Sequence, residues 1–250
     1  MRPVVFLHGW TMAGDVFADA AARLGEGFAC HAPDLPGHGA ARGCPAGIER
    51  SAEAVAALLD DSDLRDVLLV GWSMGATVAW RYLERFGHAR VAGMVSLDMS
   101  PWVLNGPDWS LGLMRQGAGG ARAKVGWFRD CWPQAAAMIA GGMFAGGGDA
   151  PGMTRAEAEA RILANDAAVM AGIWASLIEA DMREAVRRLP VPMLAIHGAQ
   201  SRLYPPETAA WLAREAPDAR MLCFEHSGHS PHLEEPERFA REIAEFAAGL

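Results

Sequence analysis

A serine between two glycines, in the string Gly71-Trp72-Ser73-Met74-Gly75, could act as a nucleophile. A serine hydroxyl attacks a carbonyl carbon only when a nearby base accepts its proton and hydrogen-bond donors stabilise the oxyanion that forms. The G-x-S-x-G pattern is typical of a sharp turn from a strand into a helix, with glycines where backbone segments pass close together. The string also occurs by chance, so its meaning depends on the flanking elements. It predicts acyl transfer through a covalent intermediate on Ser73.

The base predicted for this serine is His229, which lies in Ser227-Gly228-His229-Ser230-Pro231. This segment follows the last predicted strand, where a loop can bring an imidazole over the end of the sheet. The order of serine before histidine is the order found with this kind of turn. The alternative is a loop histidine that makes a structural hydrogen bond. We interpret His226 and His232 as loop or lid-facing residues and His197 as structural.

Two backbone N–H groups are predicted to form the oxyanion hole. One is that of Met74, directly after the nucleophile, and the other is that of Trp10, in the loop after the first strand. This loop begins His8-Gly9-Trp10, in which Gly9 allows a close backbone approach. His8 either orients the loop by hydrogen bonding or is a packed structural imidazole.

The elements around these residues predict an α/β fold. Short apolar runs rich in β-branched residues alternate with amphipathic stretches, which is typical of a buried parallel sheet wound with helices. The predicted strands are 4–7, 28–32, 67–70, 91–97, 193–196 and 220–225. The predicted helices are 14–25, 49–61, 75–87, 206–215 and one from about 236. The serine string thus has a strand before it and a helix after it, which strengthens its interpretation as a nucleophile turn.

The segment 102–184 differs from the rest of the chain because it is rich in tryptophan, methionine and glycine. We predict a helical insertion there, called the lid, between two parts of a core formed by 1–101 and 185–250. Flat indoles and soft thioethers suit an apolar pocket, although ordinary helix packing uses the same residues. The predicted pocket residues are Trp102, Trp127, Trp132, Met143, Met170 and Trp174.

Composition excludes several classes of protein. The chain has 250 residues, 51% of them hydrophobic, and a formal net charge of -8. It can bury a sizeable core, and it lacks the basic surface that a nucleic-acid partner requires. Its four cysteines are isolated, which predicts reduced thiols in a cytoplasmic protein. No apolar run reaches the length of a membrane span or a secretory signal. No metal-ligand cluster or phosphate-binding motif appears, so we predict no metal and no cofactor.

Taken together, the motifs resemble those of the α/β-hydrolase superfamily over nearly the whole chain. The matching segments are His8-Gly9-Trp10, Asp34-Leu35-Pro36-Gly37-His38-Gly39, Gly71-Trp72-Ser73-Met74-Gly75, Val191-Pro192-Met193 and Gly228-His229. Within it, the opening and the serine turn are most similar to the pimeloyl-[acyl-carrier protein] methyl ester esterases and related small carboxylesterases. The resemblance implies a serine esterase acting on a small or carrier-bound ester. Perhydrolases and hydrolases of C–N or C–C bonds share the pattern. A non-catalytic ligand-binding or signalling protein on the same scaffold is the alternative from another class.

The chain departs from the family pattern at the triad acid. The family usually has an aspartate in a Gly-x-x-Asp string after the penultimate strand, but this string ends in Ser201 here. The superfamily offers a second position after the strand that follows the serine helix, and there the chain has Asp98. We therefore predict Asp98 as the acid that orients His229. Alternatively, Asp98 only caps or packs at this strand end, and Glu225 and Asp218 are weaker substitutes.

A second departure concerns the first strands. The family has two antiparallel strands before the His-Gly strand, but that strand starts by residue 4 here. We therefore predict a mostly parallel sheet of about six strands with the strand 28–32 at an edge, and a monomer or a dimer formed across that edge.

The lid also carries a basic cluster on an otherwise acidic protein. Its members are Arg115, Arg122, Lys124 and Arg129. Such a cluster could dock an acidic acyl carrier protein, and a solvated helix face is the alternative.

Overall fold

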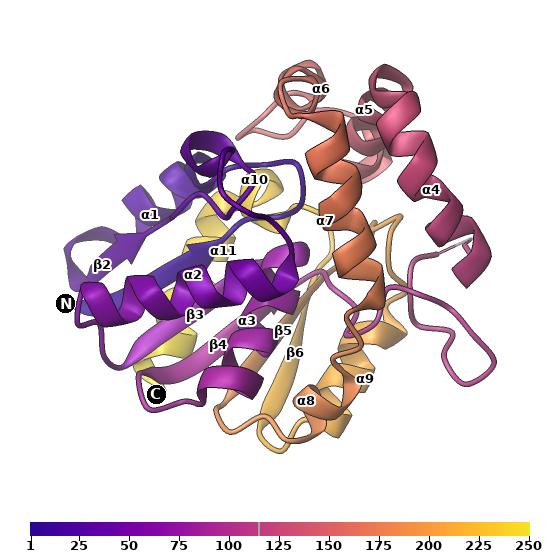
Figure 1. Ribbon diagram of the computed structural model, residues 1–250. Coiled ribbons are helices and arrows are strands. Elements are labelled where there is room, and N and C mark those ends of the chain that lie inside the picture. Colours follow the sequence, from indigo (N-terminus) through magenta and orange to yellow (C-terminus); the bar gives the residue numbers. More distant parts are fainter. Residues whose placement is uncertain (115) are drawn as a thin grey trace.

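The computed structural model describes residues 1–114 and 116–250 and has a six-stranded parallel sheet at its centre (Figure 1). The strand order is β2-β1-β3-β4-β5-β6, and all neighbouring strands pair in parallel. The strands are β1 (Arg2–Leu7), β2 (Phe28–His31), β3 (Val67–Trp72), β4 (Val91–Leu97), β5 (Met193–Gly198) and β6 (Ala219–Phe224). The predicted α/β class, the number of strands and the edge position of β2 are confirmed.

The burial of each strand follows its place in the sheet. Every residue of β3 and β5 is buried, and both are apolar apart from His197 near the end of β5, as expected for strands covered on both faces. The edge strands β2 and β6 are only partly buried. Because the strands are parallel, their carboxyl ends lie along one edge of the sheet, and the loops that follow them meet there.

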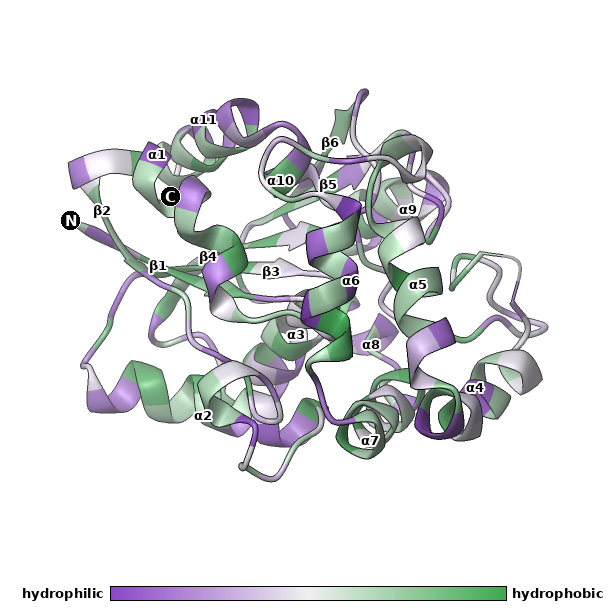
Figure 2. Ribbon diagram, turned by 90° about the horizontal axis from the view of Figure 1, so that it is seen from above, coloured by the Kyte–Doolittle hydropathy of each residue, from purple (hydrophilic) through white to green (hydrophobic). Residues whose placement is uncertain are grey.

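Helices cover both faces of the sheet. Helices α1 (Ala18–Leu24) and α11 (Pro236–Ala248) pack together on one face, and α2 (Ile48–Asp61) and α3 (Met74–Phe86) pack together on the other (Figure 2). The remaining core helices are α8 (Arg183–Arg187), α9 (Glu207–Glu215) and the single turn α10 (Pro231–Glu234). The predicted helical segments of the core are all present, with their ends shifted by a few residues at most.

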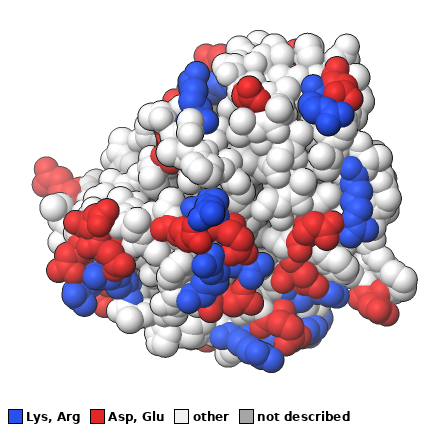
Figure 3. Space-filling model, viewed as in Figure 1, with Lys and Arg blue, Asp and Glu red and all other residues white. Residues whose placement is uncertain are grey.

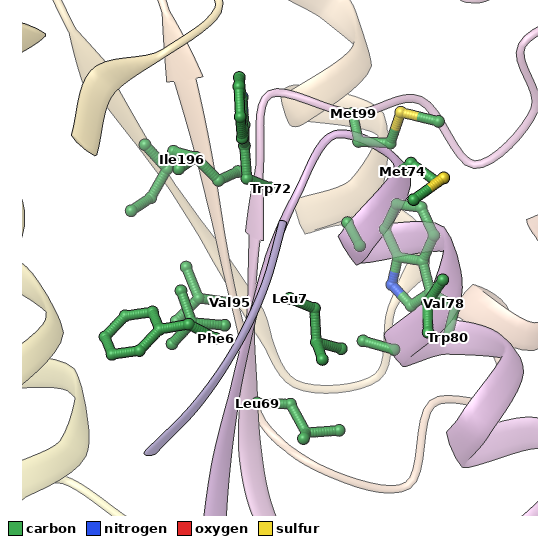
Figure 4. Close-up of a cluster of buried hydrophobic side chains, with 14 of the residues drawn as sticks. Phe6, Leu7, Leu69, Trp72, Met74, Val78, Trp80, Val95, Met99 and Ile196 are labelled. Atoms are coloured by element: carbon green, nitrogen blue, oxygen red, sulfur yellow. The ribbon is translucent and has the colours of Figure 1, made fainter. Parts of the chain in front are cut away.

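The core around β1 and β3 holds α3, the helix that follows Ser73, against the sheet. Figure 4 shows Leu7 and Leu69 on the side of the strands that faces α3, where Val78 and Trp80 meet them. Phe6 lies on the opposite side. These five side chains are fully buried, and each contributes about 1.5–3 kcal/mol relative to an exposed position.

Four longer helices lie between β4 and β5 and rise above the carboxyl edge of the sheet (Figure 1). They are α4 (Ala118–Asp130), α5 (Trp132–Met143), α6 (Arg155–Leu163) and α7 (Ala167–Glu179). Helix α4 packs on α7, and α5 packs on α6. Thr154 begins α6 with a reciprocal capping box to Glu157. The segment is helical, as the sequence suggests, and its role as a lid with the boundaries 102–184 stays a prediction.

All four cysteines are free thiols. Among residues 1–114 and 116–250, no single helix is both long and apolar enough to cross a membrane. Helices α6 and α7 reach the required length and composition only as a pair, and they are bent by 101° relative to each other.

Candidate active site

Ser73 lies in a strained turn between β3 and α3. Its φ of 52° and ψ of −121° are unusual for a residue with a side chain, and such strain persists only where the surroundings impose it. The turn is tight because a Cβ on Gly75 would lie 1.9 Å from the carbonyl oxygen of Leu7, and one on Gly71 would lie 2.5 Å from Ala76. The two glycines are therefore required by close backbone contact. Ser73 is presented at the N-terminus of α3, where the helix dipole favours negative charge.

Asp98 lies directly after β4 and binds the imidazole of His229. The Nδ1–H of His229 donates to Oδ2 of Asp98 at 2.7 Å, and both side chains are buried. This bond leaves Nε2 of His229 free to accept a proton. Glu225 instead pairs with Arg238 at 2.7 Å on the surface. The structure thus brings Asp98, and not Glu225, to the predicted base.

The carboxylate of Asp98 has three further donors that the sequence analysis did not assign to it. His197 Nδ1 donates to Oδ1 at 2.9 Å, the N–H of Gly198 approaches the same oxygen at 3.4 Å, and Ser201 Oγ donates to Oδ2 at 2.7 Å. Burial alone would raise the pKa of Asp98, but the hydrogen bonds from His197 and His229 outweigh burial and lower that pKa to about 2. Asp98 is therefore ionised at neutral pH.

His197, interpreted above as structural, touches the candidate acid because its strand neighbours β4. Leu97 pairs with Ile196 across the two strands, so the next residues, Asp98 and His197, lie side by side. The pairing of two consecutive strand ends was the signal that could have revealed this contact. Ser201, at the position where the family usually has its acid, supplies a hydroxyl to the carboxylate at Asp98.

The loop that carries His229 is fixed from both sides by Glu234. Its Oε2 accepts from the N–H groups of Gly228 at 2.9 Å and Ser230 at 3.1 Å, and its Oε1 accepts from the N–H of Ala145 at 2.6 Å. Burial raises the pKa of Glu234 above its ordinary value, although these donors act in the opposite direction. The backbone carbonyl of His229 also accepts from the indole N–H of Trp72 at 2.7 Å. The imidazole is thus held by backbone contacts as well as by Asp98.

The loop after β1 is positioned by two buried histidines. His8 Nε2 accepts from the N–H of Leu35 at 2.9 Å, and His38 Nε2 accepts from the N–H of Thr11 at 3.3 Å. Burial lowers the pKa of His8 to about 3, so the ring stays neutral and can accept. The alternative in which His8 orients the loop is therefore the one that the hydrogen bonds favour.

Trp10 lies in the loop after β1, and Met74 is the first residue of α3; their role in an oxyanion hole stays a prediction. Within the described part of the chain, the backbone N–H of neither residue has an acceptor. The indole N–H of Trp10 donates to the carbonyl of Met170 in α7 at 3.1 Å, so the loop is joined to the helices above it. Both backbone donors remain available for an oxyanion.

A cavity of about 190 Å³ lies between the sheet edge and the overlying helices. Ser73 and His229 both line it, together with Trp10 and Tyr204. The rest of the wall is mainly apolar and comes from the segment between β4 and α4, from α4, α5 and α7, and from the loop after β5. Its apolar members are Leu113, Met114, Phe128, Met138, Ile139, Met143, Trp174, Leu177 and Leu203. Gly9 also lines the cavity, and a Cβ there would lie 3.1 Å from the ring of Trp72, closer than most contacts of a Cβ. The arrangement can hold an apolar acyl chain against a serine nucleophile.

Two of the six predicted pocket residues, Met143 and Trp174, line this cavity. The other four do not, and the reason is that large side chains of these helices pack against each other. Trp132 packs edge-on against Trp10 at 6.2 Å between ring centroids, and Trp127 packs on Phe128. The other two have their own contacts: the ring of Trp102 lies under the guanidinium of Arg183, and Met170 is fully buried in α7, where its carbonyl accepts from the indole N–H of Trp10.

The wall residues that the sequence analysis missed, Phe128 and Tyr204 among them, come from different elements and had no common motif. In the described segments no group of three or more His, Cys, Asp or Glu side chains could hold a metal ion.

Comparison with known proteins places the chain in a family. A model described as the alpha/beta hydrolase family matches residues 4–242. The chain is 32% identical to a pimeloyl-[acyl-carrier protein] methyl ester esterase of Aromatoleum aromaticum, with 99% of each chain covered. It is 30% identical to the protein of the same name from Chromobacterium violaceum, covering 97% of this chain and 92% of that one. A solved esterase from Exiguobacterium antarcticum has the same fold, with a TM-score of 0.89 at 22% identity over 99% of this chain and 92% of that one. The chain therefore belongs to the α/β-hydrolase family.

Proposed function

We propose that the protein hydrolyses a carboxylic ester through an acyl-enzyme on Ser73. The observation that carries the proposal is that the strained Ser73 and His229, which Asp98 holds by a hydrogen bond, both line one mainly apolar cavity. In the first step Ser73 Oγ forms a bond to the ester carbonyl carbon while His229 Nε2 accepts its proton. The bond to the alcohol then breaks, and the alcohol takes that proton. Water attacks the acyl carbon in the same way and restores the free serine.

The roles of the other residues follow from their positions. Asp98 holds His229 in the tautomer with the proton on Nδ1 and stabilises the imidazolium that forms during each step. The backbone N–H groups of Trp10 and Met74 stabilise the oxyanion. The overlying helices exclude water from the acyl chain, which is the role proposed for the segment 102–184.

The substrate class that the relatives suggest is an acyl methyl ester, free or bound to an acyl carrier protein, because their printed name specifies that substrate. The predicted docking cluster on the lid is largely neutralised by ion pairs, and basic and acidic side chains lie interspersed on the face seen in Figure 3. Arg122 pairs with Glu179 at 2.9 Å, and Arg129 pairs with Asp130 at 2.9 Å. Arg115 lies outside the described residues. Lys124 lines the cavity.

A fluorophosphonate probe tests the proposal directly, since it reacts covalently with an activated serine. We expect one probe molecule per chain on Ser73, no labelling of Ser73→Ala, and a fall in the hydrolysis of a short methyl ester by at least about a thousandfold in that variant. Thr208→Ala, which loses a hydroxyl that donates to Leu111 away from the cavity, is the matched control. A wild-type protein that takes up no probe and hydrolyses no ester would support the non-catalytic alternative. Preferred turnover of amides or of peroxide would support the other hydrolase classes.

A further inference from the structure

Lys124 carries a positive charge into the candidate active-site cavity without a carboxylate partner. It lies on α4, lines the cavity and is half-buried. Among the described residues, the one hydrogen-bond partner of its ammonium is the thioether of Met138, at 3.9 Å. Burial lowers its pKa, and no nearby carboxylate counteracts this. Arg122 and Arg129 of the same helix each have an acidic partner, so α4 pairs its surface cations and leaves the cavity-facing one unpaired.

A second cation, Arg202, lines the same cavity from the loop after β5. It forms no ion pair with any carboxylate of the described residues. Its one hydrogen bond there is a long one, from Nη1 to the carbonyl of Gly141 at 3.4 Å. A cation near the last turn of α5 interacts favourably with the helix dipole. This contact, however, uses only one of the five N–H donors of the guanidinium.

The wall around Arg202 continues into a neighbouring open hollow of about 400 Å³. The hollow and the cavity share four lining residues, Met138, Gly142, Arg202 and Leu203. Arg155 lines the hollow as well, and it too has no ion pair in the described part of the chain. A Cβ on Gly141 would lie 3.8 Å from the guanidinium of Arg155, and one on Gly147 would lie 3.4 Å from that of Arg202. Glycines thus leave the space beside both guanidinium groups open.

Lys124 is half-buried on an apolar wall, where an unpaired charge is costly unless a ligand supplies the counter-charge. Arg202 is exposed to solvent, so this cost does not apply to it, but it lines the same cavity. We propose that the esters hydrolysed here carry an anionic group, a carboxylate or a phosphate, at the end remote from the reacting ester, and that Lys124 and Arg202 bind it. The inference rests on the proposed esterase function, because the reacting ester lies at Ser73. The carboxylate source is a half-ester of a dicarboxylic acid, whose free acid reaches Lys124. The phosphate source is a carrier arm that leaves the cavity past Arg202 and Arg155.

The carboxylate arm of the test uses a monomethyl ester of a linear dicarboxylic acid and its neutral dimethyl ester, with the holoprotein and Lys124→Met. The methionine keeps an unbranched apolar stem of similar length. We expect kcat/KM for the monomethyl ester to fall at least tenfold, because charged hydrogen bonds contribute about 1.5–3 kcal/mol. The value for the dimethyl ester should change less than twofold, which also shows that the variant folds. Lys124→Arg should restore the preference, and Arg220→Met, a cation on β6, is the control.

The phosphate arm compares two methyl esters. In the first compound the other end of the acyl chain is a thioester to phosphopantetheine, and in the second it is a thioester to N-acetylcysteamine, which lacks the phosphate. If the anion is a phosphate, Arg202→Met lowers kcat/KM at least fivefold for the first compound only. A wild-type protein that hydrolyses neutral esters but shows no response to charge in either arm would overturn this inference and leave the esterase function intact. Failure to hydrolyse any ester would contradict the esterase function itself.

Discussion

At the scale of single residues, the distinctive feature is where the acid lies. Asp98 follows β4, and its two oxygens accept from His197, His229 and Ser201. A carboxylate at position 201 would stand within hydrogen-bond distance of another carboxylate, and like charges so close cannot both ionise at neutral pH. A serine there donates a proton instead. The replacement at position 201 is thus compatible with a working acid at position 98.

Replacing Asp98 tests this arrangement. In Asp98→Asn the amide can donate to His229 Nδ1 and favour the wrong tautomer, so we expect kcat to fall about a thousandfold to ten-thousandfold. Ser201→Ala removes only a donor to the carboxylate and should lower kcat less than tenfold. Steady-state kinetics on a short methyl ester, with circular dichroism to confirm folding, measures both. Full activity in Asp98→Asn would show that another group is the acid.

At the scale of elements, the serine turn is fixed by contact between β1 and the start of α3. The two glycines of the turn occupy positions where a Cβ would overlap backbone atoms. The pairing of β4 with β5 then places Asp98 next to His197 and opposite the loop of His229. The positions of Ser73, Asp98 and His197 therefore follow from strand ends that pack side by side.

Gly75→Ala should destabilise the protein strongly. Its Cβ would lie 1.9 Å from the carbonyl oxygen of Leu7, so backbone must shift, and we expect a loss of about 3 kcal/mol or more in the free energy of unfolding. Gly172→Ala in the exposed interior of α7 meets no atom within 4 Å and should stabilise by about 0.5–1 kcal/mol. Urea unfolding compares the two. Equal stability of Gly75→Ala and wild type would contradict the close packing of β1 and α3.

At the scale of the whole molecule, buried histidines make stability depend on pH. His8 and His232 are almost completely buried, and burial lowers the pKa of each from 6.5 to about 3. The unfolded chain therefore binds protons at these groups at a higher pH than the folded one. Their neutral forms contribute full stability above about pH 6.5, and this contribution is lost as the pH falls toward 3. Asp98, with its pKa lowered to about 2, adds a similar loss only below about pH 4.

His232 is the group to replace, because neither of its ring nitrogens has a hydrogen-bond partner among the described residues. It packs between Phe17 and Trp72, each 4.6 Å away between ring centroids. In His232→Leu we expect the slope of unfolding free energy against pH, measured by urea unfolding between pH 4.5 and 6, to fall by about 1.4 kcal/mol per pH unit. The wild type measured at the same pH values is the reference. An unchanged slope would show that His232 is protonated in the folded protein.

The sequence by itself determined the sheet, the serine turn and the candidate base, because these depend on local patterns. Apolar runs make buried strands, two glycines permit a tight turn, and a histidine after the last strand must lie at the edge where parallel strands end. Only the tertiary structure decided which residues surround them. The contacts of His197 and Ser201 with Asp98 depend on which strand lies beside which, and no spacing along the chain states that.

The same holds for the cavity. Its walls come from helices that pack against each other. Most of the predicted tryptophans therefore pack against neighbouring side chains, while Phe128 and Tyr204 line the cavity. In the sequence, Lys124 could not be distinguished from Arg122 and Arg129, which form ion pairs on the surface of α4. Only the packing of α4 shows that Lys124 lines the cavity.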